Sequence, residues 1–375
     1  MPVQTLDSIR QITAADWDAL LPGAAQPFLR HAFLACLEDS GSAVAATGWQ
    51  PSHRLWRDAR GELRAILPAW IKSHSRGEYV FDWGWAEACQ RAGIAYYPKL
   101  LTAVPFSPVV GPRLLGAPAA CAQLLGEVSA TLGEQGLSSW HLNFNEPAEA
   151  ALLARQPGWL QRSGCQFHWF NRGYRDFQDF LDGFASRKRK QVRKERELVA
   201  GQGLEFVWLA GHELSEAQWD FVYRCYANTY RLRGQAPYLT REFFSLLAER
   251  MPEAIRVNLV RQGARPVAMA FLLSAGDSLY GRYWGCLQDF ANLHFETCFY
   301  QGIEQAIAGG LQRFDAGAQG EHKLVRGFEP VLTQSWHYLE HAGLRAAVAS
   351  FLREEHEQVL RYREQALAAL PYRRG

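Results

Sequence analysis

The sequence predicts a mixed α/β protein, with mixed sheets, that consists of two similar halves. Its 375 residues exceed what one hydrophobic core usually supports, so two domains are the starting expectation. Each half shows, in the same order, a helix, a strand hairpin, and a helix that leads into a strand. Because no single offset aligns these three pairs, we expect the first half to carry extra residues, roughly at 84–115.

The first pair of matching segments is a helix that begins shortly after a proline, Pro27 in one half and Pro237 in the other. In the second copy Thr240 is a suitable N-cap, and the aromatic residues that follow it form a stripe to be buried. The second pair is a hairpin, with residues 55–70 matching residues 257–273 across short Gly-containing turns.

The third pair is a helix that ends near a glycine and continues into a strand. Residues 124–136 lead into 137–144, and residues 303–310 lead into 311–317. Glycine suits these helix ends because it adopts the positive φ of a helix C-cap at no steric cost.

The second half can be divided more finely. It predicts strands over 204–209, 255–260, 267–273, 278–284, 313–316 and 333–338, and helices over 215–230, 240–250, 293–308 and 344–367. The order is strand, two helices, three strands, helix, strand and final strand, which is that of the acetyltransferase (GNAT) superfamily. We therefore predict two tandem GNAT-like domains, 1–172 and 173–375.

Composition and charge exclude several classes of protein. A net charge of +2 provides no global attraction to nucleic acid or membranes, so any contact with a polyanion must be local. The seven cysteines are scattered and form no CxxC pair, which indicates reduced thiols and a cytoplasmic protein. The most apolar long stretch, 94–110, contains Lys99 and three prolines and cannot be a membrane-spanning helix.

Three motifs resemble those of a bacterial family of predicted N-acyltransferases, the FemAB-like family. They are the segments 279–285, 294–296 and 317–328, the last reading GAQGEHKLVRGF. Segments 105–108, 111–113 and 186–190 extend the resemblance over most of the chain. The family resembles the peptidoglycan FemABX aminoacyltransferases, which append amino acids from aminoacyl-tRNA to peptidoglycan precursors.

The resemblance implies an acyltransferase that moves an acyl or aminoacyl group to an amine, on a cell-wall precursor or peptide. It implies no tightly bound cofactor, with acyl-CoA or aminoacyl-tRNA as co-substrate. The loop before the helix at 293–308 departs from the Gly-rich pyrophosphate cradle of CoA-dependent GNAT enzymes. It holds one glycine, Gly285, and one acid, Asp289.

The motif around residue 321 offers the groups that amide formation needs. Glu321 or His322 could act as general base, since the acceptor amine must lose a proton. Lys323 and Arg326 could hold a carboxylate or phosphate, and Gln319 belongs to the same run. The alternative is a turn whose charges face water, with Glu321 paired to Arg326.

A second set of candidates precedes and opens the helix at 293. His294, Glu296 and Tyr300 are candidate catalytic groups, and Glu296 and Tyr300 share a helix face. In the preceding strand, alternation places Arg282 and Trp284 on one face and Tyr283 on the other. We expect Arg282 to meet an acid, either Glu296 or a ligand group, while sheet core is the competing interpretation of the two aromatic residues.

A basic run lies within a helix predicted over 184–200. Arg187, Lys188 and Arg189 open it, and seven of the ten residues 187–196 are basic. The run could bind tRNA phosphates or a CoA phosphate, although a solvated helix face explains it as well. The His and Glu residues of the site region lack HxxxH-type spacing, so no metal site is predicted.

The same sequence features are also compatible with a different class of function. A duplicated fold can lose catalysis and keep binding, so the chain could be a non-catalytic module that recognises a peptidoglycan-type or peptide ligand. Tight binding without any covalent product would distinguish this alternative.

Overall fold

The computed structural model describes residues 3–23, 26–317 and 320–373, and the chain forms two compact units. Unit 1 comprises Met1–Cys165 and Leu332–Tyr362, and unit 2 comprises Gln166–Val331 and Arg363–Gly375. The predicted halves were continuous, 1–172 and 173–375. In the structure each unit combines two separate segments, because residues 332–362 group with the N-terminal part of the chain.

Unit 1 is built on a mixed sheet with the strand order β2-β5-β6-β8-β15. Its strands are β2 (Trp49–Pro51), β5 (Trp70–Lys72), β6 (Lys99–Thr102), β8 (Ser139–Leu142) and β15 (Glu329–Leu339). Within this sheet β6 and β8 are parallel. A second sheet has the order β1-β3-β4-β7, with β1 (Gln4–Leu6), β3 (His53–Arg57), β4 (Leu63–Leu67) and β7 (Leu115–Gly116).

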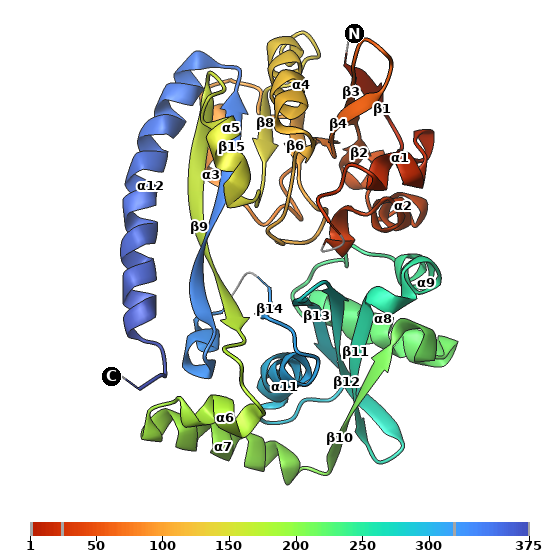
Figure 1. The fold of residues 1–375 in the computed structure, drawn as a ribbon, viewed down its shortest axis with the longest axis vertical. Coiled ribbons are helices and arrows are strands. Elements are labelled where there is room, and N and C mark those ends of the chain that lie inside the picture. The colour runs from red at the N-terminus through yellow and green to blue at the C-terminus, as the bar shows by residue number, and fades with distance from the viewer. Residues whose placement is uncertain (1–2, 24–25, 318–319, 374–375) are drawn as a thin grey trace. The chain divides into compact units, whose positions relative to one another are not determined.

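One face of the main sheet of unit 1 carries an apolar core. Alternation along β6, β8 and β15 places Leu100, Trp140 and Trp336 in one cluster with Leu124 and Leu125 of α4 (Pro118–Thr131). Figure 1 shows α4 beside β6 and β8. Pro118 stands at the start of α4, where its missing N–H costs no hydrogen bond. The opposite face of β6 and β8 carries the buried polar residues Lys99, Ser139 and His141.

Pro68 divides the second strand of the hairpin that the sequence predicts over 55–70. Proline cannot donate a hydrogen bond to a neighbouring strand, so β4 ends at Leu67 and a new strand, β5, begins at Trp70. As a result β4 belongs to the small sheet and β5 to the main sheet. The predicted insert, roughly 84–115, also includes the main-sheet strand β6.

The remaining elements of unit 1 are helical except for the start of β9. The helices are α1 (Ala14–Asp18), α2 (His31–Asp39), α3 (Trp83–Arg91), α5 (Ala150–Leu153) and most of α12 (Ala342–Ala368). Leu339 of β15 packs with Val348 and Leu352 of α12 and with Trp85 of α3.

Unit 2 contains a sheet with the order β10-β11-β12-β13-β14-β9. Its strands are β9 (Trp159–Phe170), β10 (Leu204–Ala210), β11 (Ile255–Gln262), β12 (Arg265–Ala275), β13 (Ser278–Cys286) and β14 (Arg313–Asp315). Its helices are α6 (Phe177–Asp182), α7 (Ser186–Ala200), α8 (Glu216–Arg231), α9 (Arg241–Arg250), α10 (Leu293–Phe295) and α11 (Gln301–Ala308).

The two units share one supersecondary feature, which explains the third pair of matched segments. In unit 1 the parallel strands β6 and β8 are separated in the chain by α4, and in unit 2 the parallel strands β13 and β14 are separated by α11. The predicted fold class is confirmed: the protein is a mixed α/β protein with two tandem GNAT-like halves. Among the described residues no helix is both long and apolar enough to span a membrane.

Candidate functional site

The carboxyl ends of β13 and β14 form the centre of the candidate site in unit 2. These parallel strands pair only over Ser278–Tyr280 and Arg313–Asp315. Beyond that point β13 and β14 no longer pair with each other. The pairing of β13 with β12 also shifts, since Phe271 faces Tyr283 whereas Leu272 faces Gly281. Arg282 is therefore the extra residue of a β-bulge, a feature that often re-aims side chains beside active sites. The bulge breaks the predicted alternation of residues 282–284.

Arg282 meets an acid, as expected, but the acid is Asp315 and not Glu296. Its Nη2 lies 2.8 Å from Asp315 Oδ2, and both side chains are buried. Asp315 also accepts a hydrogen bond from the backbone N–H of Gly317. Burial opposes ionisation of Asp315, yet the charge of Arg282 outweighs it and holds the pKa of this carboxyl well below its usual range.

Lys323 places an ammonium group next to this ion pair. The residue is 2% exposed, and its Nζ donates a 2.6 Å hydrogen bond to the carbonyl oxygen of Gly317. Burial lowers the pKa of Lys323 to about 8, against the opposing effect of Asp315. Lys323 lies in a single helical segment, Glu321–Arg326, that begins after Gly320 at φ 116° and ends at Gly327 at φ 88°. Both glycines adopt positive φ angles that other residues rarely accept.

His322 and His294 lie on the aromatic side of the same region. Their ring centroids are 5.9 Å apart, and His322 also contacts the rings of Phe295 and Phe299. His322 is exposed at one side, and the pKa of its ring is lowered by partial burial and then by the charges of Arg326 and Lys323. Burial lowers the pKa of His294 to about 4. Both imidazoles are therefore neutral at pH 7, the form that accepts a proton.

Arg326 is bound to an acid of the basic helix, Glu195. Its Nη2 donates to Glu195 Oε2 at 2.8 Å, and its guanidinium lies 3.5 Å from the centre of the Phe295 ring. Glu195 also accepts a 2.5 Å hydrogen bond from the hydroxyl of Tyr300. Burial and this carboxylate raise the pKa of Tyr300 above its usual value, so Tyr300 stays protonated and acts as a donor.

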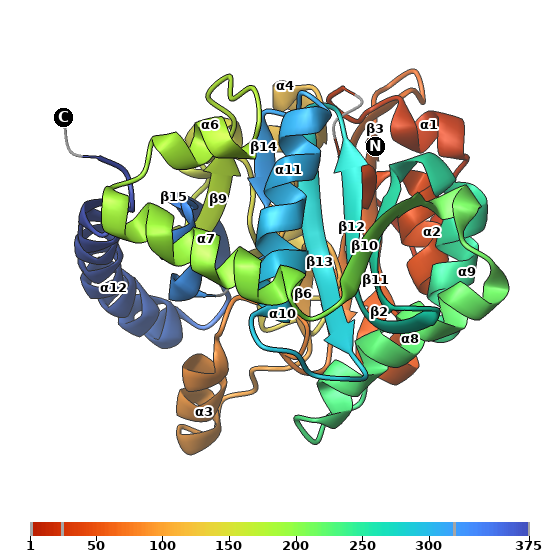
Figure 2. The same ribbon diagram turned by 90° about the horizontal axis from the view of Figure 1, so that it is seen from below.

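Glu296 is bound to the basic helix. Arg196 bridges Glu296 at 2.8 Å and Glu304 at 2.7 Å. A π-helical turn over Glu296–Tyr300 brings both Glu296 and Tyr300 to the α7 side, and Figure 2 shows α7 lying across α10 and α11. π-helical turns are rare in proteins, and those that occur often lie at functional sites. Glu296 and Tyr300 therefore hold α7 against the site.

The N-terminal part of α7 keeps its cations toward solvent. Arg187, Lys190 and Lys194 are exposed and follow the spacing of one helix face. Lys188 and Arg189 are half-buried, and Arg189 lies 3.4 Å from Asp182. The basic run thus has one end anchored by Glu195 and Arg196 and one end available for an anionic partner.

The other predicted residues have differing surroundings. Tyr283 packs against Tyr226, Phe244 and Phe271 in an aromatic cluster, which favours the core interpretation. Trp284 contacts the ring of His294. Glu321 is exposed at the start of its helix, and Gln319 lies outside the described residues. Within the described ranges no group of three or more His, Cys, Asp or Glu side chains could hold a metal ion.

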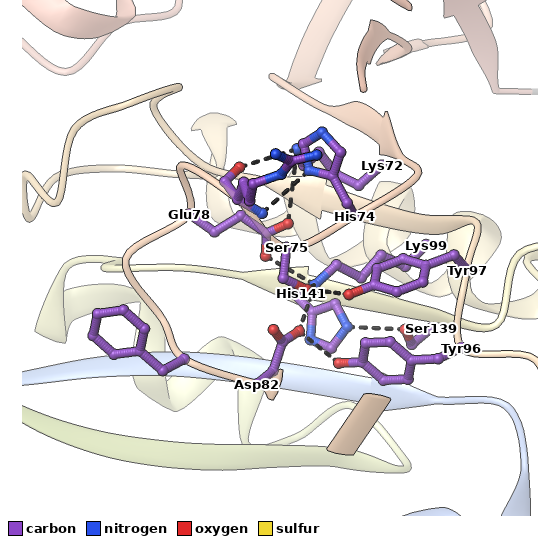
Figure 3. Close-up of polar contacts among 12 residues, drawn as sticks. Lys72, His74, Ser75, Glu78, Asp82, Tyr96, Tyr97, Lys99, Ser139 and His141 are labelled. Atoms are coloured by element: carbon purple, nitrogen blue, oxygen red, sulfur yellow. Dashed lines mark hydrogen bonds and ion pairs between the residues drawn. The ribbon is translucent and has the colours of Figure 1, made fainter. Parts of the chain in front are cut away.

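Unit 1 contains a second polar cluster that the sequence did not predict (Figure 3). Lys72 of β5 and Lys99 of β6 are paired across the strands and are fully buried. Lys99 Nζ donates to Glu78 Oε2 and Ser75 Oγ at 2.8 Å and also contacts Asp82. Both acids come from the connection between β5 and β6, which covers this face of the sheet.

Two buried histidines extend this cluster across the sheet. His141 Nδ1 lies 2.6 Å from His337 Nδ1, and His141 Nε2 lies 2.9 Å from Ser139 Oγ. Burial and the charge of Lys99 lower the pKa of His141 to about 3, so the ring is neutral. His337 of β15 therefore belongs to this cluster in unit 1.

Sequence reasoning missed Asp315, Glu195 and the cluster around Lys99. One signal was available: Lys99 stood out as a charge inside the most apolar stretch of the chain. A lysine inside a buried strand requires acids nearby, because an isolated buried charge is very costly. Asp315 lies within the strand predicted over 313–316, but no pattern identified Arg282 as its partner.

Solved structures show the same fold at low sequence identity. The C-terminal domain of a putative lysylphosphatidylglycerol synthetase from Agrobacterium fabrum is 9% identical, with a TM-score of 0.56 over 90% of this chain and 95% of that one. FemX is 11% identical, with a TM-score of 0.54 over 93% and 100% of the chains. L-PGS from Bacillus licheniformis is 11% identical, with a TM-score of 0.52 over 88% and 97%.

A search of curated protein sequences finds no match. In contrast, residues 8–374 match the model of one family, described as peptidoglycan biosynthesis/recognition. The match covers nearly the whole chain, including both units and the candidate site. The chain belongs to the FemAB-like family.

Proposed function

We propose that this protein is an N-acyltransferase that moves an acyl or aminoacyl group from an activated donor to an amine acceptor. The observation that carries the proposal is the adjacency of Lys323 and His322. Lys323 provides a buried ammonium beside the Arg282–Asp315 pair. His322 provides an exposed imidazole that is neutral at pH 7. Family membership and the FemX-like fold support the same reaction class.

In the proposed reaction the acceptor nitrogen attacks the carbonyl carbon of the donor. His322 accepts the proton that the attacking amine loses, which general base catalysis requires. The Lys323 ammonium stabilises the negative charge that develops on the carbonyl oxygen. A C–N bond forms, the C–O or C–S bond to the carrier breaks, and His322 returns its proton to the leaving group. Glu321 is the alternative base.

We favour aminoacyl-tRNA over acyl-CoA as donor. The loop before α10 holds Asp289, and Asn292 at the start of α10 has φ 61° without a side-chain cap, which is unlike a Gly-rich pyrophosphate cradle. The exposed cations of α7 suit an RNA phosphate backbone. The name of one similar structure, a putative lysylphosphatidylglycerol synthetase, agrees with an aminoacyl group. We place the reaction in the cytoplasm, with a cell-wall precursor or peptide amine as acceptor.

The test is product formation with two labelled donors, aminoacyl-tRNA and acetyl-CoA, and a panel of peptide amines. An amide product survives mild alkali, whereas the ester of aminoacyl-tRNA does not. Alkali-stable label on an amine acceptor is the expected result. Donor or acceptor binding without any covalent product would instead support the binding-module alternative, and label on a hydroxyl acceptor would contradict an N-acyltransferase.

A further inference from the structure

A cavity of about 520 Å³ lies in unit 2 on the C-terminal half of α8. Its wall includes Tyr223, Arg224, Asn228 and Arg231 of α8, together with Pro237 and Leu287. None of its lining residues is acidic, and two are cationic. The cavity thus has the size of a small-molecule site and a positive wall.

The two arginines lie on one face of the helix. Positions 224, 228 and 231 are four and three residues apart, so their side chains lie above one another along α8. Asp220, the natural partner of Arg224 one turn earlier, is instead bound by Arg241 at 2.8 Å. Within the described part of the chain Arg224 has no carboxylate or hydrogen-bond partner, and Arg231 donates only to Asn228 Oδ1.

The rest of the wall is apolar. Tyr223, Pro237 and Leu287 contribute ring and aliphatic surface, and Leu287 is 41% exposed. A ligand that combines an anionic group with an adjoining apolar group would satisfy both parts of this wall. Guanidinium groups favour carboxylates and phosphates because they donate two parallel hydrogen bonds.

The cavity is connected to the strand that carries the candidate site. Asn228 Nδ2 donates to the carbonyl oxygen of Cys286 at 2.9 Å, and Thr229 Oγ1 donates to that of Trp284 at 2.8 Å. A Cβ atom at Gly285 would lie 2.0 Å from the carbonyl oxygen of Cys225, so only glycine permits this contact. The end of β13 and the cavity wall on α8 are therefore in direct contact.

We propose that this cavity binds a small molecule with a carboxylate or phosphate next to an apolar group, held by Arg224 and Arg231. As a substrate subsite it rests on the proposed function, because β13 links it to Arg282. Binding itself does not depend on turnover, so the proposal can be tested apart from catalysis.

The experiment is calorimetric titration of the full chain with phenylacetate, phenyl phosphate and the neutral analogue 2-phenylethanol. We expect saturable binding of at least one anion and much weaker binding of the alcohol. The R224A and R231A variants should each weaken anion binding about tenfold, the usual loss for one charge-assisted hydrogen bond. The R224K variant should retain part of the affinity. Preference for phenylacetate would indicate a carboxylate ligand, and preference for phenyl phosphate a phosphate ligand.

The R233A variant is the matched control, since Arg233 is exposed close to the cavity but does not line it. It should bind the anions as the unmodified protein does. Three outcomes would overturn the proposal: no saturable binding of either anion, equal binding of the alcohol, or equal weakening in R224A and R233A. A chain that shows no transferase activity but binds the anion through Arg224 would refute the proposed function and leave this site standing.

Discussion

Arg282 and Asp315 form a buried ion pair between the carboxyl ends of two parallel strands, with Nη2 and Oδ2 2.8 Å apart. Removing one partner leaves the other charge buried and uncompensated. We expect D315A to lower the free energy of unfolding by about 3–5 kcal/mol, as measured by urea denaturation. The R282M/D315L double variant should recover most of this loss. Equal stability of D315A and the unmodified protein would show that the pair is not desolvated.

Replacing His322 tests the proposed base. His322 is exposed, so H322A should leave the unfolding temperature unchanged while kcat falls by about 10²–10⁴, the usual contribution of a general base. H212A is the matched control, because His212 is an exposed histidine of the same unit. E321A should be assayed in parallel. A larger loss in E321A than in H322A would transfer the role of base to Glu321.

The pH dependence of the rate should report Lys323. Its pKa is about 8, so the ammonium is present below pH 8 and is lost above it. We expect kcat to fall above about pH 8, and K323R to extend the plateau because arginine stays charged. Between about pH 8 and 10.4 the unfolded chain binds more protons at this lysine than the folded chain does. The contribution of Lys323 to stability should therefore rise with pH in that range. A rate that is constant up to pH 10 would contradict the role of the ammonium.

The exposed face of α7 predicts a salt-dependent interaction with RNA. Substituting Arg187, Lys190 and Lys194 with alanine should reduce the slope of log K against log salt by about 2, given roughly 0.7 per phosphate contact on a single strand. The measurement is a filter-binding series from low to high salt. A control variant removes three exposed arginines elsewhere, Arg60, Arg233 and Arg265. Similar slopes for both variants would show that only net charge matters.

The cluster around Lys99 predicts a strong effect on stability in unit 1. K99M leaves Glu78 and Asp82 as buried acids without their main cation, so we expect a loss of about 3–5 kcal/mol in the free energy of unfolding. The exposed Lys190 provides the control, K190M, which should be near neutral. If K99M unfolds at the same urea concentration as K190M, the cluster is solvated in solution.

Much of the fold followed from local patterns in the sequence. The helix with Thr240 as N-cap begins as expected at Arg241. The three antiparallel strands β11–β13, the helix α11 and the long C-terminal helix α12 lie close to their predicted ranges. These elements are determined by periodicity, caps and turns, which act over a few residues. The assignment of 332–362 to unit 1 depends on tertiary contacts, which no local pattern contains.

The sequence predicted which residues form the candidate site but not which residues they contact. Motif positions identified Arg282, His322, Lys323 and Arg326, and the structure places these four residues near β14 and the helix that follows it. Their partners could not be predicted, because Asp315 and Glu195 become neighbours only through strand pairing and helix packing. The bulge at Arg282 interrupts the side-chain alternation, and such register shifts leave no reliable trace in one sequence.

The most direct test of the central claim is a single-turnover transfer assay with labelled aminoacyl-tRNA and a peptide amine acceptor. It compares the unmodified protein with H322A, K323M and the H212A control, all checked for unchanged folding by circular dichroism. The account predicts an alkali-stable amide with the unmodified protein and H212A, and a loss of about 10²-fold or more in H322A and K323M. Full transfer by both site variants would contradict the assignment of the active site to His322 and Lys323.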